Sequence, residues 1–366
     1  MQTPLRAHTS IDWLSCILTF CIAAIGLLFV FSATHSAEQP ISLFFKKQLV
    51  GVLVGICLYA FFAFADYRVL TRWGYFAFFG VIALLLFTLI KGSIGMGAQR
   101  WINLGFIKFQ PSELAKPLFP AFVSYYFYTH DEQNNRSWRQ FFPLLVMLGF
   151  SFMLILKQPD LGTALVIGIC GVTLLWLAGL SKKFFLYGAL ACILSAPLLW
   201  KMLKPYQKNR IAVFFGYGTT QKERYQIEQA TIAIGSGGIY GKGLQKGTQN
   251  TLQFLPESRT DFIFAVICEE WGFIGALFVL MLYFLLCTRI LLLVPTISRV
   301  SAQLLAIGLL LHIALAAFIN IAMVMGLLPI VGIPLPLVSY GLSNLIISCA
   351  SLGWIQGISR EDKLGK

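Results

Sequence analysis

"FLPESRTDFIFAVICEEWGFIGALFVLMLYFLLC", residues 254–287, contains a hydrophobic run from 262 to 287 that is interrupted by only two charged residues. About 20 apolar residues are enough to cross the hydrocarbon core of a bilayer as a helix. Four carboxylates lie in or just before this run, those of Glu257, Asp261, Glu269 and Glu270. Each charge placed at membrane depth costs about 2.5–3.5 kcal/mol on insertion scales, so these residues are candidates for a functional role.

The composition of the whole chain is that of a polytopic membrane protein. Of its 366 residues, 58% are apolar and 12% are charged, whereas soluble domains have about 25% charged residues. Backbone groups in lipid find hydrogen-bond partners only within a helix, so we predict an all-α fold, a single membrane domain over residues 1–366. Ten spans are expected, at residues 11–33, 48–65, 74–91, 112–128, 140–156, 161–180, 184–203, 262–287, 302–327 and 336–357.

One large loop, residues 204–260, separates the seventh and eighth predicted spans, and a helix is expected within it near 222–234. The net charge of +13 bears on the orientation of the chain. Long loops are largely exempt from the positive-inside rule. When the basic residues of this loop and of the few residues just before it are left out, a cytoplasmic N-terminus places 12 basic residues inside and 6 outside. We therefore expect cytoplasmic N- and C-termini and an extracytoplasmic large loop.

Three predicted helices begin on the outer side with an acidic residue: Glu113 in "QPSELAKP" (110–117), Asp160 in "KQPDLG" (157–162) and Asp261 in "RTDFIF" (259–264). Helix capping explains each one singly, because a carboxylate at a helix N-terminus gains about 0.3–1 kcal/mol. The alternative is that the three converge on one cavity, with Asp261 as a general base. The residues themselves leave both explanations open.

The other charged residues also allow two explanations each. Glu113 and Lys116 are three residues apart on one helix face and are expected to pair, either as an inert ion pair or to orient a substrate. Glu269 and Glu270 point about 100° apart, and we expect them to form interhelical hydrogen bonds. Arg100 and Arg210 belong either to a solvated surface or to a site that binds a diphosphate. Arginine suits the second role because its planar guanidinium group can donate two parallel hydrogen bonds to a phosphate.

A nucleotide site is not expected in the glycine-rich "AIGSGGIYGKG" (233–243), because its glycines lack the spacing of a phosphate-binding loop. Several longer motifs do match a known family. They are "GAQRWINLGFIKFQPSELAKP" (97–117), "QPDLGTA" (158–164), "IEQATIAIGSGGIYGKG" (227–243), "KGTQNTLQFLPESRTDFIFAVICEEWG" (246–272) and "GIPLPLVSYG" (332–341). In this order they resemble the SEDS (shape, elongation, division, sporulation) family, and "GFIKFQPSE" and "GKGLQKGTQ" look more like its elongation branch than its division branch.

The resemblance implies a glycosyltransferase that polymerises lipid II into peptidoglycan glycan strands on the outer face of the cytoplasmic membrane, with inversion and release of undecaprenyl diphosphate. It implies a role in cell-wall elongation and cell shape, with a class B penicillin-binding transpeptidase as partner and no nucleic acid. Mg²⁺ or Mn²⁺ is the cofactor to consider, although Gln253 stands where relatives often have a glutamate. It places the catalytic aspartate on Asp261 and the polar cavity on Arg100, Glu113, Lys116, Asp160 and Arg210.

Two other functions would use the same residues, besides the division-specific branch of the family. A lipid II flippase would line a passage for the headgroup with charges spread across the membrane. In this chain the charges gather on the outer side, apart from Glu269 and Glu270. A scaffold that only recruits a transpeptidase would leave the polar cavity unexplained.

Overall fold

The computed structural model describes residues 11–35, 41–95, 98–103, 108–130, 138–202, 205–217, 221–252 and 254–364. Each of the ten predicted spans coincides with a helix, although several boundaries differ. The ten helices are α1 (Trp13–Thr34), α2 (Leu43–Phe64), α3 (Tyr67–Lys91), α4 (Pro111–His130), α5 (Trp138–Lys157), α6 (Leu161–Leu177), α7 (Lys182–Met202), α11 (Ile263–Leu293), α12 (Val300–Val324) and α13 (Leu342–Leu364).

Seven helices in the described part of the chain are long and apolar enough to cross a membrane: α1, α2, α3, α5, α11, α12 and α13. Large apolar side chains such as Phe273, Leu277 and Phe284 on α11 are exposed, as expected for a surface that faces lipid tails. The chain is therefore an all-α multi-pass membrane protein. The count of ten spans stays a prediction, since α6 is apolar but has only 17 residues.

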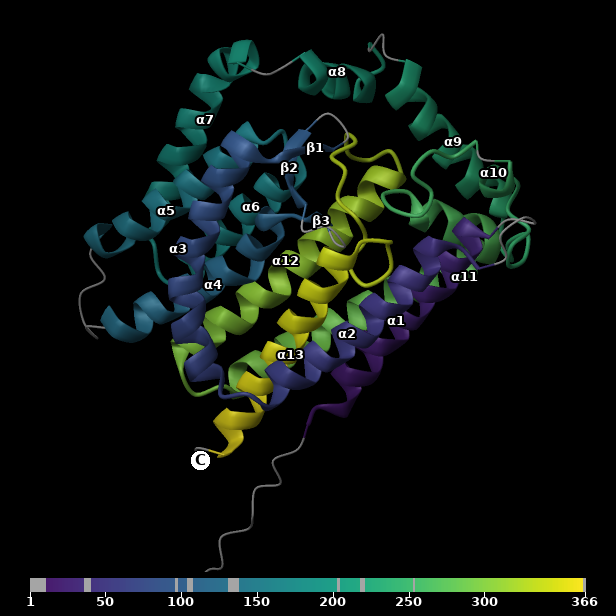
Figure 1. Cartoon of the computed structure of the whole chain (residues 1–366). Helices are drawn as coiled ribbons and strands as arrows, with labels where there is room; N and C mark the ends of the chain where they lie inside the picture. Colours follow the sequence, from purple (N-terminus) through teal and green to yellow (C-terminus); the bar gives the residue numbers. More distant parts are fainter. Residues whose placement is uncertain are drawn as a thin grey trace, which may run out of the picture.

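Close helix contacts in the centre of the bundle depend on small residues. In Figure 1, α12 and α13 lie in the middle, with α1, α2 and α11 on one side and α3 to α6 on the other. Gly353 and Gly357 of α13 lie directly against backbone carbonyl oxygens of Tyr59 and Phe62 in α2, where a Cβ atom would clash. This small-xxx-small spacing lets two membrane helices approach closely without a hydrophobic driving force between them.

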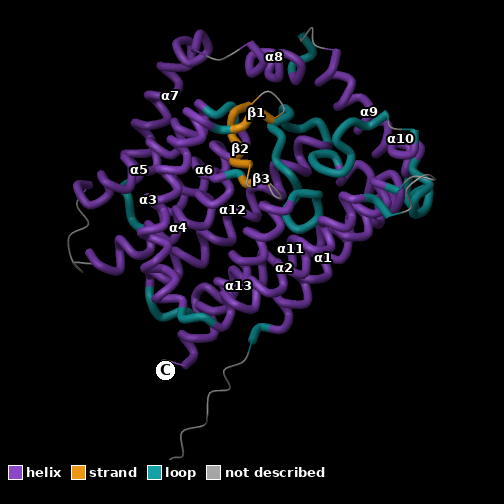
Figure 2. The backbone as a smooth tube through the Cα atoms, viewed as in Figure 1, coloured by secondary structure: helices purple, strands orange, loops and turns teal. Residues whose placement is uncertain are grey.

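The two ends of the bundle differ in structure. The start of α1 and the end of α13 lie at one end (Figure 1). The other end carries a small antiparallel sheet, β1 (Ser93–Gly95), β2 (Ala98–Asn103) and β3 (Lys108–Phe109), together with α8 (Pro205–Phe214), as Figure 2 shows. This sheet was not predicted, because it lies between the third and fourth predicted spans, where we identified no strand from the sequence. The helix predicted near 222–234 is confirmed as α9 (Gln221–Gly237), and α10 (Thr248–Thr251) follows it in the same loop.

The predicted start of the last span is wrong. The last span was predicted to start at 336, but α13 starts at Leu342. Pro334 and Pro336 disfavour a helix there, and Leu337 has a positive φ of 66°, so the segment before α13 is irregular.

The eighth predicted span was also read as one regular helix, whereas Gly272 breaks α11 with φ 67° and ψ −162°. The turn around Gly241 packs directly against this break, leaving no room for a Cβ atom on Gly272. The amide of Phe273 donates to the carbonyl of Gly238 at 2.9 Å, so the loop after α9 satisfies a donor that the break releases. A glycine is required here both by its backbone angles and by the close approach of the loop.

Candidate active site

Asp261 lies two residues before α11 begins at Ile263 and is partly buried. The N-cap position belongs to Phe262, and no side chain caps this helix. The Asp261 carboxylate accepts no hydrogen bond from the described residues, so the capping explanation does not hold for it. The Asp261 carboxylate is therefore not used by the described part of the structure and is available for a functional role.

The backbone of Asp261 is held firmly by Asn320, in the last turns of α12. The Asn320 Nδ2 group donates to the carbonyl oxygen of Asp261 at 2.8 Å and to that of Ile333 at 2.7 Å. Asn320 is fully buried, and both of its amide protons are used in these two bonds. Asn320 thus fixes the position of Asp261 while leaving the Asp261 side chain untouched.

The two residues before Asp261 are held by the loop that leads into α13. The Ser339 hydroxyl donates to the carbonyl of Thr260 at 2.6 Å, and the Tyr340 amide donates to the carbonyl of Arg259 at 2.9 Å. Ser339 is itself buried, and its hydroxyl oxygen accepts a hydrogen bond from the Leu335 amide in the same loop. The segment before α11 is therefore anchored on two sides, which is the preorganisation that a catalytic group needs.

Burial raises the pKa of Asp261 from 3.8 to about 6, and the negative charge of Glu257 adds to this effect. Arg100 from β2 and Arg210 from α8 lower the pKa, but they do not outweigh desolvation. The two arginines therefore lie within electrostatic range of Asp261. A carboxyl with a pKa near 6 is ionised at pH 7 and is more basic than an ordinary aspartate, as a general base requires.

Asp160 connects Arg100 to the start of α6. Its carboxylate lies 3.6 Å from the Arg100 guanidinium, accepts from Gln110 Nε2 at 2.6 Å, and caps α6 by accepting from the Thr163 amide at 3.2 Å. The capping role considered for Asp160 is thus confirmed, alongside its contact with Arg100. The Nε group of Arg100 is buried without a hydrogen-bond partner among the described residues, which leaves a donor available. We call Asp261, Arg100, Arg210 and Asp160 the outer cluster.

Glu113 and Lys116 form the expected ion pair, with 2.6 Å between Nζ and Oε1. Both side chains are buried in α4, at 6% and 4% exposure. Their connection to the outer cluster runs through Gln110, whose carbonyl accepts from the Glu113 amide at 3.1 Å while its side chain donates to Asp160. The pair is therefore buried next to the cluster and linked to it through Gln110.

Glu269 and Glu270 hold other parts of the protein to α11. Glu269 accepts from Lys242 Nζ at 2.7 Å and from the Thr248 hydroxyl at 3.1 Å, which ties the loop after α9 to α11. Glu270 accepts from the Ser32 hydroxyl of α1 at 2.6 Å, so the predicted interhelical hydrogen bond is confirmed for this residue. Their contacts are those of structural residues.

A metal site made by the protein alone is not present in the described residues, where no group of three or more His, Cys, Asp or Glu side chains could hold an ion. Gln253 lies outside the described residues. Mg²⁺ commonly uses one or two carboxylates together with substrate phosphates. Asp261, with Glu257 within electrostatic range of it, offers that number of carboxylates.

The comparisons with known proteins identify the family of the chain. The family model described as cell cycle protein, FtsW/RodA/SpoVE, matches residues 12–364. The chain belongs to the FtsW/RodA/SpoVE family. The peptidoglycan glycosyltransferase MrdB of Escherichia coli K12 is 38% identical over 323 residues, which cover 87% of this chain and 86% of that relative. The stage V sporulation protein E of Bacillus subtilis 168 is 34% identical, with 97% and 98% covered.

Solved structures of FtsW/RodA/SpoVE-like fold extend the match to nearly the whole chain. A chain from a structure described as "Structural coordination of polymerization and crosslinking by a peptidoglycan synthase complex" superposes with a TM-score of 0.81 at 28% identity, covering 96% of this chain and 98% of that one. The rod shape determining protein RodA of Thermus thermophilus gives 0.72 at 28% identity, with 96% and 97% covered. The SEDS resemblance of the motifs is confirmed, and the family member is RodA-like.

Proposed function

We propose that this chain is a peptidoglycan glycosyltransferase that polymerises lipid II into glycan strands during cell-wall elongation. The observation that carries the proposal is the Asp261 carboxyl group. It has no hydrogen-bond donor among the described residues, a pKa raised to about 6, and Arg100 and Arg210 within electrostatic range. The similarity to relatives named peptidoglycan glycosyltransferase supports the same reaction.

In the proposed reaction, Asp261 acts as the general base. A sugar hydroxyl is a poor nucleophile until a positioned base removes its proton in the transition state. The hydroxyl oxygen of one lipid-linked unit forms a bond to the anomeric carbon of another, and the bond from that carbon to the diphosphate oxygen breaks. The proton passes to Asp261, the lipid diphosphate leaves with the electron pair, and the anomeric centre is inverted.

Arg100 and Arg210 are proposed to stabilise the charge that develops on the leaving diphosphate. The buried Nε donor of Arg100 supports this role, and Asp160 orients the Arg100 guanidinium. We assign Glu113 and Lys116 to positioning, because their ion pair is buried behind the outer cluster. Any Mg²⁺ or Mn²⁺ is proposed to come with the diphosphate, and no step above depends on it.

The proposed topology has cytoplasmic termini and an extracytoplasmic outer cluster. Two observations support it: the excess of basic residues in the short segments assigned to the inside, and the position of the α1 start and the α13 end at the bundle end opposite the sheet (Figure 1). We further propose a class B penicillin-binding transpeptidase as partner within the elongation machinery. A similar structure that combines polymerisation and crosslinking in one complex supports this.

The test is lipid II polymerisation by purified full-length protein, with products separated on a gel. Asp261→Asn should make no polymer. The matched control, Glu228→Gln, makes the same chemical change in an exposed surface pair with Arg224 and should keep the wild-type rate. Polymer formation by Asp261→Asn at the wild-type rate would refute the assignment of the base. Transport of labelled lipid II without polymerisation by the wild type would favour the flippase instead.

A further inference from the structure

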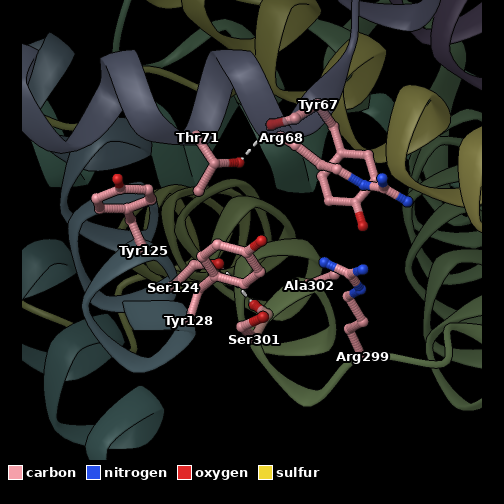
Figure 3. Close-up of a pocket in the computed structure, with 9 residues that line it drawn as sticks. All are labelled: Tyr67, Arg68, Thr71, Ser124, Tyr125, Tyr128, Arg299, Ser301 and Ala302. Carbon is pink, nitrogen blue, oxygen red and sulfur yellow. Dashed lines mark hydrogen bonds between the residues drawn. The ribbon is translucent and has the colours of Figure 1, made fainter. Parts of the chain in front are cut away.

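A pocket lies away from the outer cluster, between the first turn of α3, the last turns of α4 and the start of α12 (Figure 3). Its empty space of about 320 Å³ includes solvent outside the open mouth. Tyr67 and Arg68 line it from α3, Tyr128 from α4, and Arg299 and Ser301 from the start of α12. Nothing in the proposed glycosyl transfer uses these residues.

The lining offers hydrogen-bond donors and positive charge. Tyr67 is only 5% exposed, and its hydroxyl has no hydrogen-bond partner among the described residues. In Figure 3 this hydroxyl and the Arg299 guanidinium point toward one another. Arg68 interacts with the Tyr67 side chain, and its guanidinium carbon lies 5.8 Å from the centroid of the Tyr67 ring. A buried hydroxyl without a partner costs about 1–3 kcal/mol, which a bound ligand would recover.

The surrounding charges favour an anion. Asp66 and Glu361 act on the charge of Arg68, but neither lines the pocket. Arg299 makes no ion pair within the described residues, and its guanidinium lies 5.6 Å from the Tyr128 ring centroid. The start of α12 lies here without a side-chain cap from the described residues, and an uncapped helix N-terminus adds partial positive charge, whereas the start of α3 is capped by the Asp66 carboxylate.

The position of the pocket indicates where its ligand comes from. Ser301 lies at one end of α12, and Asn320, which holds Asp261, lies near the other. At 1.5 Å per residue the two are about 28 Å apart along the helix, close to the thickness of a hydrocarbon core. Tyrosines such as Tyr128 are typical of the membrane–water interface. We propose that this pocket binds an anionic phosphate group, from a lipid headgroup or from free phosphate, at the membrane surface opposite the outer cluster.

The experiment titrates purified full-length protein in micelles with dihexanoyl phosphatidylglycerol, with dihexanoyl phosphatidylcholine and with inorganic phosphate, and measures Kd by thermophoresis. Arg299→Gln should weaken anion binding about tenfold or more, and Tyr67→Phe about fivefold, because each removes a donor. Arg139→Gln makes the same charge change at the exposed start of α5, outside the pocket lining, and should stay within about twofold of wild type. Thermal melting of each variant establishes that it is folded.

Binding of phosphatidylglycerol alone, weakened by both pocket variants, supports a lipid headgroup as the ligand. Binding of both phosphatidylglycerol and inorganic phosphate, weakened by the same variants, supports the site and shows that the phosphate group suffices. Equal Kd values for wild type, Arg299→Gln and Tyr67→Phe overturn the proposal, as does the absence of anion binding to folded wild type. Tyr67→Phe removes one oxygen atom only, so its result does not depend on the larger arginine change.

Discussion

Replacing Asp261 by asparagine should abolish polymerisation and at the same time stabilise the folded protein at neutral pH. The reason is that the Asp261 carboxylate is ionised at pH 7 in a site that desolvates it and also contains Glu257, while Arg100 and Arg210 compensate only in part. Asparagine has nearly the same shape and carries no charge. The folded state of the variant therefore avoids the free-energy cost of holding an ionised carboxylate in a desolvated site.

The size of the effect follows from the pKa of Asp261. The change from 3.8 to about 6 corresponds to at most about 3 kcal/mol, at roughly 1.36 kcal/mol per pKa unit. The folded state binds the proton more tightly than the unfolded state, so wild-type stability falls as pH rises from about 4 to about 6. Below pH 4 the carboxyl is protonated in both states and the cost disappears. Above pH 6 the full cost is present.

The assay is thermal melting of purified protein in micelles between pH 5 and pH 8. Because 1 kcal/mol shifts Tm by about 2–4 °C in proteins of a few hundred residues, Asp261→Asn should melt several degrees above wild type at pH 8, and the gap should narrow toward pH 5. Asp160→Asn is the matched control. Its carboxylate accepts hydrogen bonds from Gln110 and Thr163, so this variant should melt below wild type at pH 8.

A Tm for Asp261→Asn equal to or below that of wild type at pH 8 would contradict this prediction, as would a difference that does not change with pH. Either result would mean that the Asp261 charge is solvated or fully paired in the folded protein. In that case a raised basicity could not explain its role as a base.

Three further predictions concern rate and stability. The kcat/KM of polymerisation should fall about tenfold per pH unit below about pH 6 and level off above it, because Asp261 must be ionised; a rate that is flat down to pH 5 would contradict this. Lys116→Met should lower stability by about 3–5 kcal/mol, since it leaves Glu113 buried and unpaired, and adding Glu113→Leu should restore much of the loss; denaturant melts compare the single and double variants. Asn320→Leu should lower kcat more than it raises KM, because it releases the Asp261 backbone, and a loss of kcat no larger than the loss of folded protein in the same preparation would contradict this.

Hydropathy predicts the helices of this protein well because lipid permits little else. A backbone in the hydrocarbon core must satisfy its hydrogen bonds within the helix, so the first span, predicted at 11–33, is observed at Trp13–Thr34. The beginning of α13 was missed because it depends on an irregular loop that is held by tertiary hydrogen bonds. One of these is the bond from the Ser339 hydroxyl to the Thr260 carbonyl, which joins segments about 80 residues apart.

Part of the site could also be predicted from the sequence, because charged residues are conspicuous in an apolar chain. Asp261, Asp160 and Glu113 stand out as charges at helix starts, and their order along the chain matches known motifs. Asn320 was missed, although a single amide inside an apolar span is itself a signal. Its role depends on the two carbonyl groups that it meets in space. The position of Arg210 near Asp261 likewise depends on the path of the long loop, which neither composition nor periodicity determines.

The break at Gly272 explains how α11 carries two carboxylates at apparent membrane depth. From Phe262 to Glu270 every residue is buried within the protein, whereas Phe273 and Ile274, directly after the break, are exposed. The first part of α11 is therefore a helix inside the protein, and only the part after Gly272 faces lipid. Glu269 and Glu270 consequently meet Lys242 and Ser32 instead of hydrocarbon. Because these two residues fix the first part of α11 to the loop and to α1, the segment that carries Asp261 adjoins a helix that is held on two sides, which supports the proposed role of its carboxylate, unpartnered among the described residues.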